Sequence, residues 1–201
     1  MLDILRPDVK IDVLTNLSVK LDNNKIYEKL KTRSHVLWNI SFDNVEKRFE
    51  YVRHGADWEL FKKNIARVQQ DFGKYRLTFH PVYSIWNAIN LVEYYDFAAE
   101  NSARVNWQLA LPKVDSKEFT TDSFVVFGHK KRIIERAVIE IDKLPYRDEL
   151  IQGLQKSLIT DIEKPGKDKS FLEWTARMEN FMPPIQKFEV LWPELLSLLN
   201  V

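Results

Sequence analysis

The chain has 201 residues, of which 45% are apolar and 12% aromatic. This is enough to bury a core within one domain, and it excludes an intrinsically disordered protein. Thirty basic and 29 acidic residues give a net charge of +1, so the chain has no large positive charge to attract nucleic acid or an acidic membrane. The sequence has no cysteine, which excludes disulfides, thiolate zinc sites, a cysteine nucleophile and an iron–sulfur cluster held by this chain alone.

Strand and helix patterns alternate along the first half of the chain. Apolar residues at period two predict strands over residues 9–16, 35–42, 75–83 and 105–111. Helical spacing predicts helices over residues 22–32, 57–70 and 90–101. Asp22 or Asn23 is expected to cap the first of these helices, and Asp57 the second. Each crossover is long enough to join parallel neighbouring strands. Residues 43–55, between the second predicted strand and the second predicted helix, are polar.

The rhythm changes after Pro112. Residues 113–121 are polar and loop-like, and residues 163–169 predict a surface turn. Helices are predicted over residues 130–141, 146–159, 170–181 and 188–199. The sequence also has no signal peptide and no run of roughly 18 apolar residues, so we expect a cytoplasmic protein.

This layout predicts an α/β fold. Three strand–helix units and a further strand make about half of a (β/α)₈ barrel, or a small open doubly wound sheet. The apolar first strand at a sheet edge favours the half barrel, as does the helix-like start of the chain before Pro7. We therefore expect a partial TIM-type β/α barrel of about four parallel strands over residues 1–112, with a helical C-terminal segment, residues 113–201, packed on it.

Polar side chains gather where the predicted strands end. Ligands of α/β sheets and barrels bind at the carboxyl ends of the strands. The four histidines have no metal-ligand spacing, so they are expected to be ordinary structural or surface histidines. Turn formation alone would also explain some of the strand-end residues. The row consists of Thr15, Asn16, Ser41, Asp43, Asn44, His80, Tyr83 and Gln108.

Several of these segments carry a resemblance. ISFDNVEKRFEYVRHG, residues 40–55, resembles the fourth-strand region of radical S-adenosylmethionine enzymes, in which a Ser-aliphatic-Asp-Gly strand end is followed by an Arg-x-Gly. Here Ser41 and Arg53 match, twelve residues apart, and VLTN, residues 13–16, resembles the family's third-strand TNG. Residues 171–199 resemble the C-terminal end of the twitch-domain subgroup, and together the similar segments span nearly the whole chain.

The resemblance implies roles for four residues. Ser41 would lie near the ribose of S-adenosylmethionine and Arg53 near its methionine carboxylate, since a guanidinium pairs bidentately with a carboxylate. Asn16 would face the same mouth from the adjacent strand, and Gln108 would be a weaker contact. The full-length parent is expected to bind S-adenosylmethionine and a 4Fe-4S cluster.

The departures from the family pattern bear on activity. The defining CxxxCxxC loop and the first two strands are missing, Leu17 stands for the glycine of TNG, and Asn44 stands for the glycine after the fourth-strand Asp. Without thiolates there is no cluster, and without a cluster no electron cleaves S-adenosylmethionine. We therefore expect a fragment of a radical S-adenosylmethionine enzyme that is inactive as it stands and has no catalytic or metal-binding residue of its own.

An alternative interpretation is a non-catalytic α/β protein that acts through protein contacts. A nucleic-acid-binding module is disfavoured by the charge balance. Four strands of a barrel do not close, so a concave apolar face and both edges would stay open. We expect a homodimer to cover that face or an edge, with C-terminal helices folded over the face as the competing possibility. The inward side chains are expected to be these or their alternating neighbours: Ile11, Val13, Trp38, Ile40, Leu77, Phe79, Trp107 and Leu109.

Overall fold

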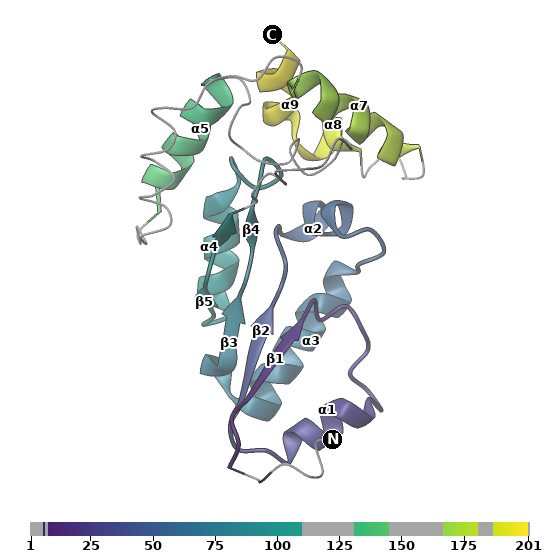
Figure 1. Cartoon of the computed structure of the whole chain (residues 1–201), viewed down its shortest axis with the longest axis vertical. Helices are drawn as coiled ribbons and strands as arrows, with labels where there is room; N and C mark the ends of the chain where they lie inside the picture. The colour runs from purple at the N-terminus through teal and green to yellow at the C-terminus, as the bar shows by residue number, and fades with distance from the viewer. Residues whose placement is uncertain (1–5, 7, 110–130, 145–166, 181–186, 201) are drawn as a thin grey trace, which may run out of the picture.

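A parallel β-sheet forms the centre of the molecule in the computed structural model (Figure 1), which describes residues 6, 8–109, 131–144, 167–180 and 187–200. The sheet has four strands in chain order, all parallel, which confirms the predicted topology. They are β1 (Ile11–Thr15), β2 (Val36–Ile40), β3 (Leu77–Phe79) and β5 (Arg104–Val105). The structure thus establishes a mixed α/β fold with four parallel strands.

The last two strands each continue past an interruption. The strand predicted over 75–83 begins instead as the short 3₁₀ helix η2 (Lys74–Arg76), runs through β3 and resumes as β4 (Val82–Tyr83). Pro81 lies at the break because it has no N–H for the ladder. Its carbonyl still accepts a hydrogen bond of 2.9 Å from the backbone N–H of Gln108 in β6 (Gln108–Leu109), which pairs with β4.

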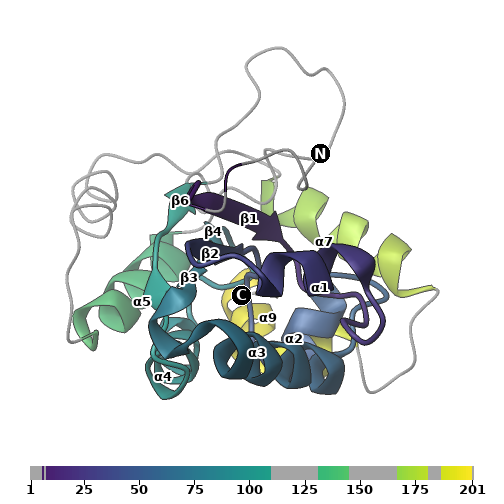
Figure 2. The same ribbon diagram turned by 90° about the horizontal axis from the view of Figure 1, so that it is seen from below.

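Three helices cover one face of the sheet (Figure 2): α1 (Lys25–Lys31), α3 (Trp58–Phe72) and α4 (Leu91–Glu100). Asp57 caps α3, as predicted, because its Oδ1 accepts the N–H of Leu60. The predicted cap of α1 was wrong by one or two residues. Asn24, rather than Asp22 or Asn23, accepts the N–H groups of Ile26 and Tyr27.

An additional helix, α2 (Glu46–Val52), lies in the polar stretch 43–55, where the sequence pattern predicted no helix. It buries Phe49 and Tyr51, although most of its other residues are charged. Its C-cap is Arg53, whose backbone N–H donates to the carbonyl of Phe49. The helix thereby turns the chain back toward the end of β2.

The core lies between the sheet and these helices. Phe42, two residues after the end of β2, stacks on Tyr94 and packs its ring against Phe61 and Phe79. Trp38 packs on Tyr27 of α1 and Phe72 of α3. The apolar strand residues that were expected to face inward therefore face the helices instead: Ile11, Val13, Trp38, Ile40, Leu77, Phe79 and Trp107.

The opposite face of the sheet is mostly polar. Side chains alternate along a strand, so Asn39, Thr78, His80 and Arg104 project there, and Leu14 is its one strongly exposed apolar side chain among the residues described. The expectation of a contiguous apolar concave face was wrong. The reason is that α1, α3 and α4 already bury the apolar half of each strand.

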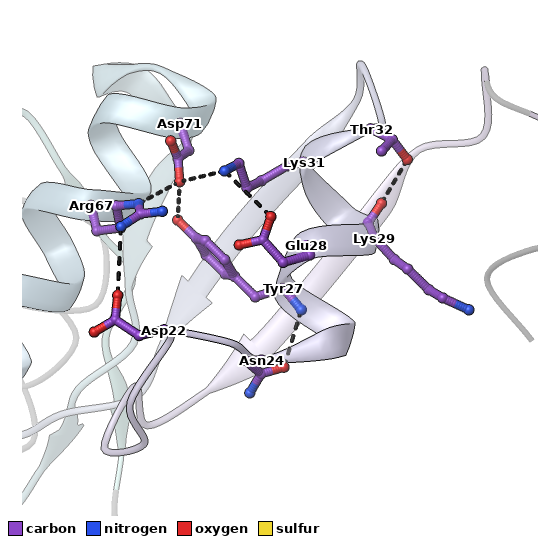
Figure 3. Close-up of polar contacts among 9 residues, drawn as sticks. All are labelled: Asp22, Asn24, Tyr27, Glu28, Lys29, Lys31, Thr32, Arg67 and Asp71. Atoms are coloured by element: carbon purple, nitrogen blue, oxygen red, sulfur yellow. Dashed lines mark hydrogen bonds and ion pairs between the residues drawn. The ribbon is translucent and has the colours of Figure 1, made fainter.

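A polar cluster connects α1 to α3 (Figure 3). The hydroxyl of Tyr27 donates to Asp71 Oδ2 over 2.9 Å, and Arg67 Nε donates to the same oxygen over 2.8 Å. Lys31 Nζ lies 3.7 Å from it. Burial, followed by the hydrogen bond to Asp71, raises the pKa of Tyr27 well above its ordinary value.

The described C-terminal helices gather beyond the carboxyl ends of the strands (Figure 1): α5 (Lys131–Asp142), α7 (Lys167–Glu179), α8 (Phe188–Leu191) and α9 (Pro193–Asn200). Trp86 lies in contact with the rings of Phe171, Trp174, Phe188 and Trp192. Trp192 Nε1 also donates to the carbonyl of Trp86 over 2.9 Å. On α5, the Glu140 carboxylate accepts the N–H of Val92 and so caps α4 from a different helix.

Some predicted features fall outside the described residues: the loop at 113–121, the helix at 146–159, the boundary at residue 112 and most of the N-terminal segment. Within the described ranges, no helix combines the length and apolarity needed to cross a bilayer.

Candidate functional site

The residues predicted from strand ends lie at the carboxyl ends of the strands. Asn16 directly follows β1, and Ser41 directly follows β2. The N–H of Ser41 donates to the carbonyl of Thr15 over 2.8 Å, which places Asn16 and Ser41 on adjacent strand ends. Gln108 lies in β6, where it pairs with Val82 of β4.

Ser41 and Arg53 meet in space. Arg53 Nη2 donates to Ser41 Oγ over 3.0 Å and to Asp43 Oδ2 over 2.8 Å. The side chains of Arg53 and Asp43 are 25% and 12% exposed, so this ion pair is largely shielded from water. α2 brings the two together, because it fills the twelve-residue interval and returns the chain to the end of β2.

Asp43 joins this cluster to the next strand. Its Oδ1 accepts the N–H of Val82 over 2.8 Å, while its Oδ2 accepts from Arg53. Its backbone carbonyl accepts a hydrogen bond from Asn87 Nδ2 over 3.0 Å. Arg53 thus orients a carboxylate that fixes the distance between the ends of β2 and β4.

The arrangement bears on the role expected for Arg53. A guanidinium that already pairs with Asp43 has its charge balanced, so a ligand carboxylate would have to compete with that pair. Ser41 accepts from Arg53 and retains its own hydroxyl hydrogen for a ligand. The geometry therefore fits Arg53 as a positioning residue better than as a direct carboxylate contact.

Asn16 and Gln108 do not contact the Arg53 cluster. Both side chains are exposed. Asn16 Oδ1 accepts the N–H of Ser18 over 3.3 Å, and the exposed amide can donate its hydrogens to a ligand or a partner. Gln108 makes no side-chain hydrogen bond to any residue that the structure describes.

Asn87 is a component that the sequence did not predict. It is completely buried, donates to the carbonyls of Asp43 and Val82, and accepts the N–H of Ser84. In SIWNAIN, an asparagine between apolar residues was the only sign of it, because a buried amide must find several partners.

A second polar contact lies on the open face of the sheet. His80 Nε2 and Asn39 Oδ1 are 3.0 Å apart, a distance that fits an imidazole with its hydrogen on Nε2. Burial lowers the pKa of His80, which favours the neutral ring at neutral pH. His80 therefore belongs to a structural contact, one of the two ordinary roles expected for the histidines.

Two cavities lie away from this edge. One, of about 670 Å³, lies between α4, β5 and the end of α5 and includes Val92 and Leu144 in its walls. The other, of about 550 Å³, lies between α2 and α4 and includes Arg48 and Glu93. No predicted site residue lines either of these two cavities.

The residues do not fit an iron–sulfur cluster, because the sequence has no cysteine. Across the described ranges, no group of three or more acidic or histidine side chains is arranged to hold a metal ion. Comparison with known proteins gives no match to a family model, to a curated protein or to a solved structure.

Proposed function

We propose that this chain forms part of a radical S-adenosylmethionine-type β/α barrel, in which it supplies a nucleoside-binding strand edge but no cluster ligand. The contact between Arg53 and Ser41 carries this proposal, because it joins the two positions at which the sequence resembles the family. The parallel order of the four strands and the helices on one face are compatible with a segment of such a barrel.

The backbone at Leu17 adds independent support. This residue stands where the family's third-strand motif has glycine. Its φ is 54°, in the left-handed region that glycine adopts without steric cost. The chain therefore keeps a turn suited to glycine at the matching place, although the residue itself differs.

The ligand chemistry follows from the groups that remain available. The Ser41 hydroxyl and the Asn16 amide lie on adjacent strand ends and suit the hydroxyls of a ribose. The charge of Arg53 is balanced by Asp43, so the methionine carboxylate of the ligand adds little binding free energy. We therefore expect S-adenosylmethionine and 5′-methylthioadenosine to bind with similar affinities, weaker than about 1 mM.

An NMR titration tests this expectation. Both ligands should shift the amide resonances of Asn16 and Ser41, and Ser41→Ala should weaken binding by about threefold or more, the worth of one hydrogen bond. Ser34→Ala, an exposed serine before the opposite end of β2, is the matched control and should change nothing. Asp43→Asn should favour S-adenosylmethionine over methylthioadenosine, because it releases Arg53. Absence of shifts at the strand ends with both ligands would refute the nucleoside site.

The genomic sequence upstream of Met1 gives a second test. An in-frame CxxxCxxC within about 120 codons, the length of two βα units and a leader, would support membership of the family. The alternative of a non-catalytic protein that acts through protein contacts is favoured by one observation, the unprotected edge of β1.

A further inference from the structure

The outer edge of β1 offers unpaired backbone groups. Among the described residues, β1 pairs only with β2. Ile11 donates its N–H to the carbonyl of His35, and Thr15 accepts from the N–H of Ser41. Alternate residues of a parallel strand bond to the same neighbour, so the N–H and C=O groups of Asp12 and Leu14 point away from the sheet.

This edge has little of the protection that natural edge strands usually carry. β1 contains no proline and no bulge, and its register with β2 is continuous from Ile11 to Thr15. Within β1 the outward positions hold one charge, Asp12, which pairs with Lys10 just before the strand over 3.7 Å, and an apolar side chain, Leu14, that is 77% exposed. A continuous edge with an exposed leucine is a template for pairing with another strand.

We propose that two copies of this chain pair antiparallel along β1, with Leu14 opposite Leu14 of the second copy. In this register Asp12 lies opposite Asn16 of the second copy, so a carboxylate meets an amide donor twice across the two-fold axis. The pairing joins two four-stranded sheets into one of eight strands. It covers the exposed leucine and uses the outward backbone groups of both copies.

Neighbouring registers match less well. A register centred on residue 12 places two Asp12 carboxylates opposite each other, which is repulsive. One centred on Val13 sets Leu14 against Asp12. One centred on Ile11 pairs Lys10 with Asp12 but leaves Leu14 facing Asp8. Only the register centred on Leu14 both avoids like charges and buries the leucine against an apolar partner. The inference does not depend on the proposed nucleoside site, since Asn16 keeps a second amide hydrogen.

Cysteine crosslinking tests the register directly, because the sequence contains no cysteine that could interfere. Leu14→Cys places two thiols on facing residues about 5.5 Å apart at Cα, within the range of a disulfide. Mild oxidation should convert it to a covalent dimer. Asp12→Cys should crosslink poorly, since its two copies would lie about 14 Å apart along the strands.

Ile139→Cys is the matched control. Ile139 is 54% exposed on α5, and its thiol should remain uncrosslinked under the same oxidation. Efficient crosslinking at residue 12 with little at residue 14 would overturn the proposed register. Equal crosslinking at residues 14 and 139 would show random collision and overturn the interface.

Light scattering of Leu14→Lys gives a readout that does not require a thiol. The exposed side chain should tolerate lysine without loss of the fold, as checked by circular dichroism. Two like charges across the two-fold axis should weaken the dimer about tenfold. Ile139→Lys should leave the dimer unchanged. A monomeric mass for the unmodified chain at every concentration tested would refute the proposal.

Discussion

Leu17 combines a backbone conformation suited to glycine with a side chain that is only 1% exposed. Two contacts hold it there: its N–H donates to Thr15 Oγ1 over 2.9 Å, and its carbonyl accepts from the buried amide of Asn64 over 2.9 Å. The left-handed conformation costs a non-glycine residue about 1 kcal/mol, while burying a leucine offsets this several-fold.

Substitution of Leu17 should therefore reverse the usual order of alanine and glycine. Leu17→Ala loses the buried side chain and keeps the strain, at a cost of about 3 kcal/mol. Leu17→Gly loses the side chain but relieves the strain, so it should be about 1 kcal/mol more stable than the alanine variant. Urea denaturation of the two variants measures the difference. A glycine variant less stable than alanine would contradict the left-handed conformation.

Asp43 is the residue on which the strand-end cluster depends. Asp43→Asn removes the charge that balances Arg53 but keeps a similar shape, and it should lower the free energy of unfolding by about 2 kcal/mol. Glu59→Gln is the control, because its ion pair with Lys62 is exposed and should contribute less than about 0.5 kcal/mol. Equal stability of the two variants would show that the Arg53 pair is not a structural tether.

At the scale of elements, helices attach to one another through carboxylates. Asp71 on α3 receives Tyr27 and Lys31 from α1, and Glu140 on α5 caps the start of α4. Burial by itself raises the pKa of Asp71, but the hydrogen bonds from Arg67 and Tyr27 and the nearby positive charges outweigh it and hold that pKa below its ordinary value.

The lowered pKa of Asp71 gives a pH-dependent contribution to stability. A carboxyl group with a lower pKa in the folded state stabilises the protein above its unfolded pKa, and this contribution disappears as the pH falls through the folded value. Asp71→Asn should therefore destabilise the protein by about 1 kcal/mol at neutral pH. The difference from the unmodified chain should shrink as the pH falls through the ordinary range of an aspartate carboxyl and below it.

Urea denaturation across this pH range is the measurement. Asp8→Asn serves as control, since its pair with Arg6 is largely exposed and should contribute little at any pH. A difference between the Asp71 variant and the unmodified chain that stays constant down to pH about 2 would contradict a depressed pKa.

At the scale of the whole molecule, Trp86 connects the strand edge to the described C-terminal helices. Its ring contacts α7 and α8, and its carbonyl accepts hydrogen bonds from both Asn44 and Trp192. The turn that follows β4 is thus held from both sides. Tyr51 of α2 completes the contact from the other half of the chain.

Trp86→Ala should loosen the C-terminal helices selectively. Loss of a buried tryptophan costs about 3–5 kcal/mol, and here most of that packing joins two parts of the molecule. Trypsin should then cleave within α7, after Lys169 or Arg177, sooner than in α3. Trp107→Ala is the matched control, because Trp107 is also 6% exposed but packs on Tyr94 and Tyr95 of α4. Equal protease sensitivity of the two variants would show that Trp86 does not anchor these helices.

The sequence by itself determined the strands, their parallel order and the amphipathic helices between them. The reason is that the spacing of apolar residues, every second residue in a strand and every third or fourth in a helix, can be read within a short stretch of sequence. It also indicated Asp57 as a helix cap and, through the family resemblance, Ser41 and Arg53 as two candidate site residues, but not the contact between them. It did not indicate α2, because helix–turn ambiguity is high in EKRFEYV, where charges mask the two buried aromatics.

Only the tertiary structure decided which face of each strand is covered. Alternation defines two faces, but the apolar one met α1, α3 and α4 rather than a concave lumen, so the open face is polar. It likewise decided that Arg53 pairs with Asp43 and that Asn87 joins the strand ends, since both contacts depend on distances between segments far apart in the chain. A sequence specifies which groups need partners, and the packing of distant elements specifies which partners they find.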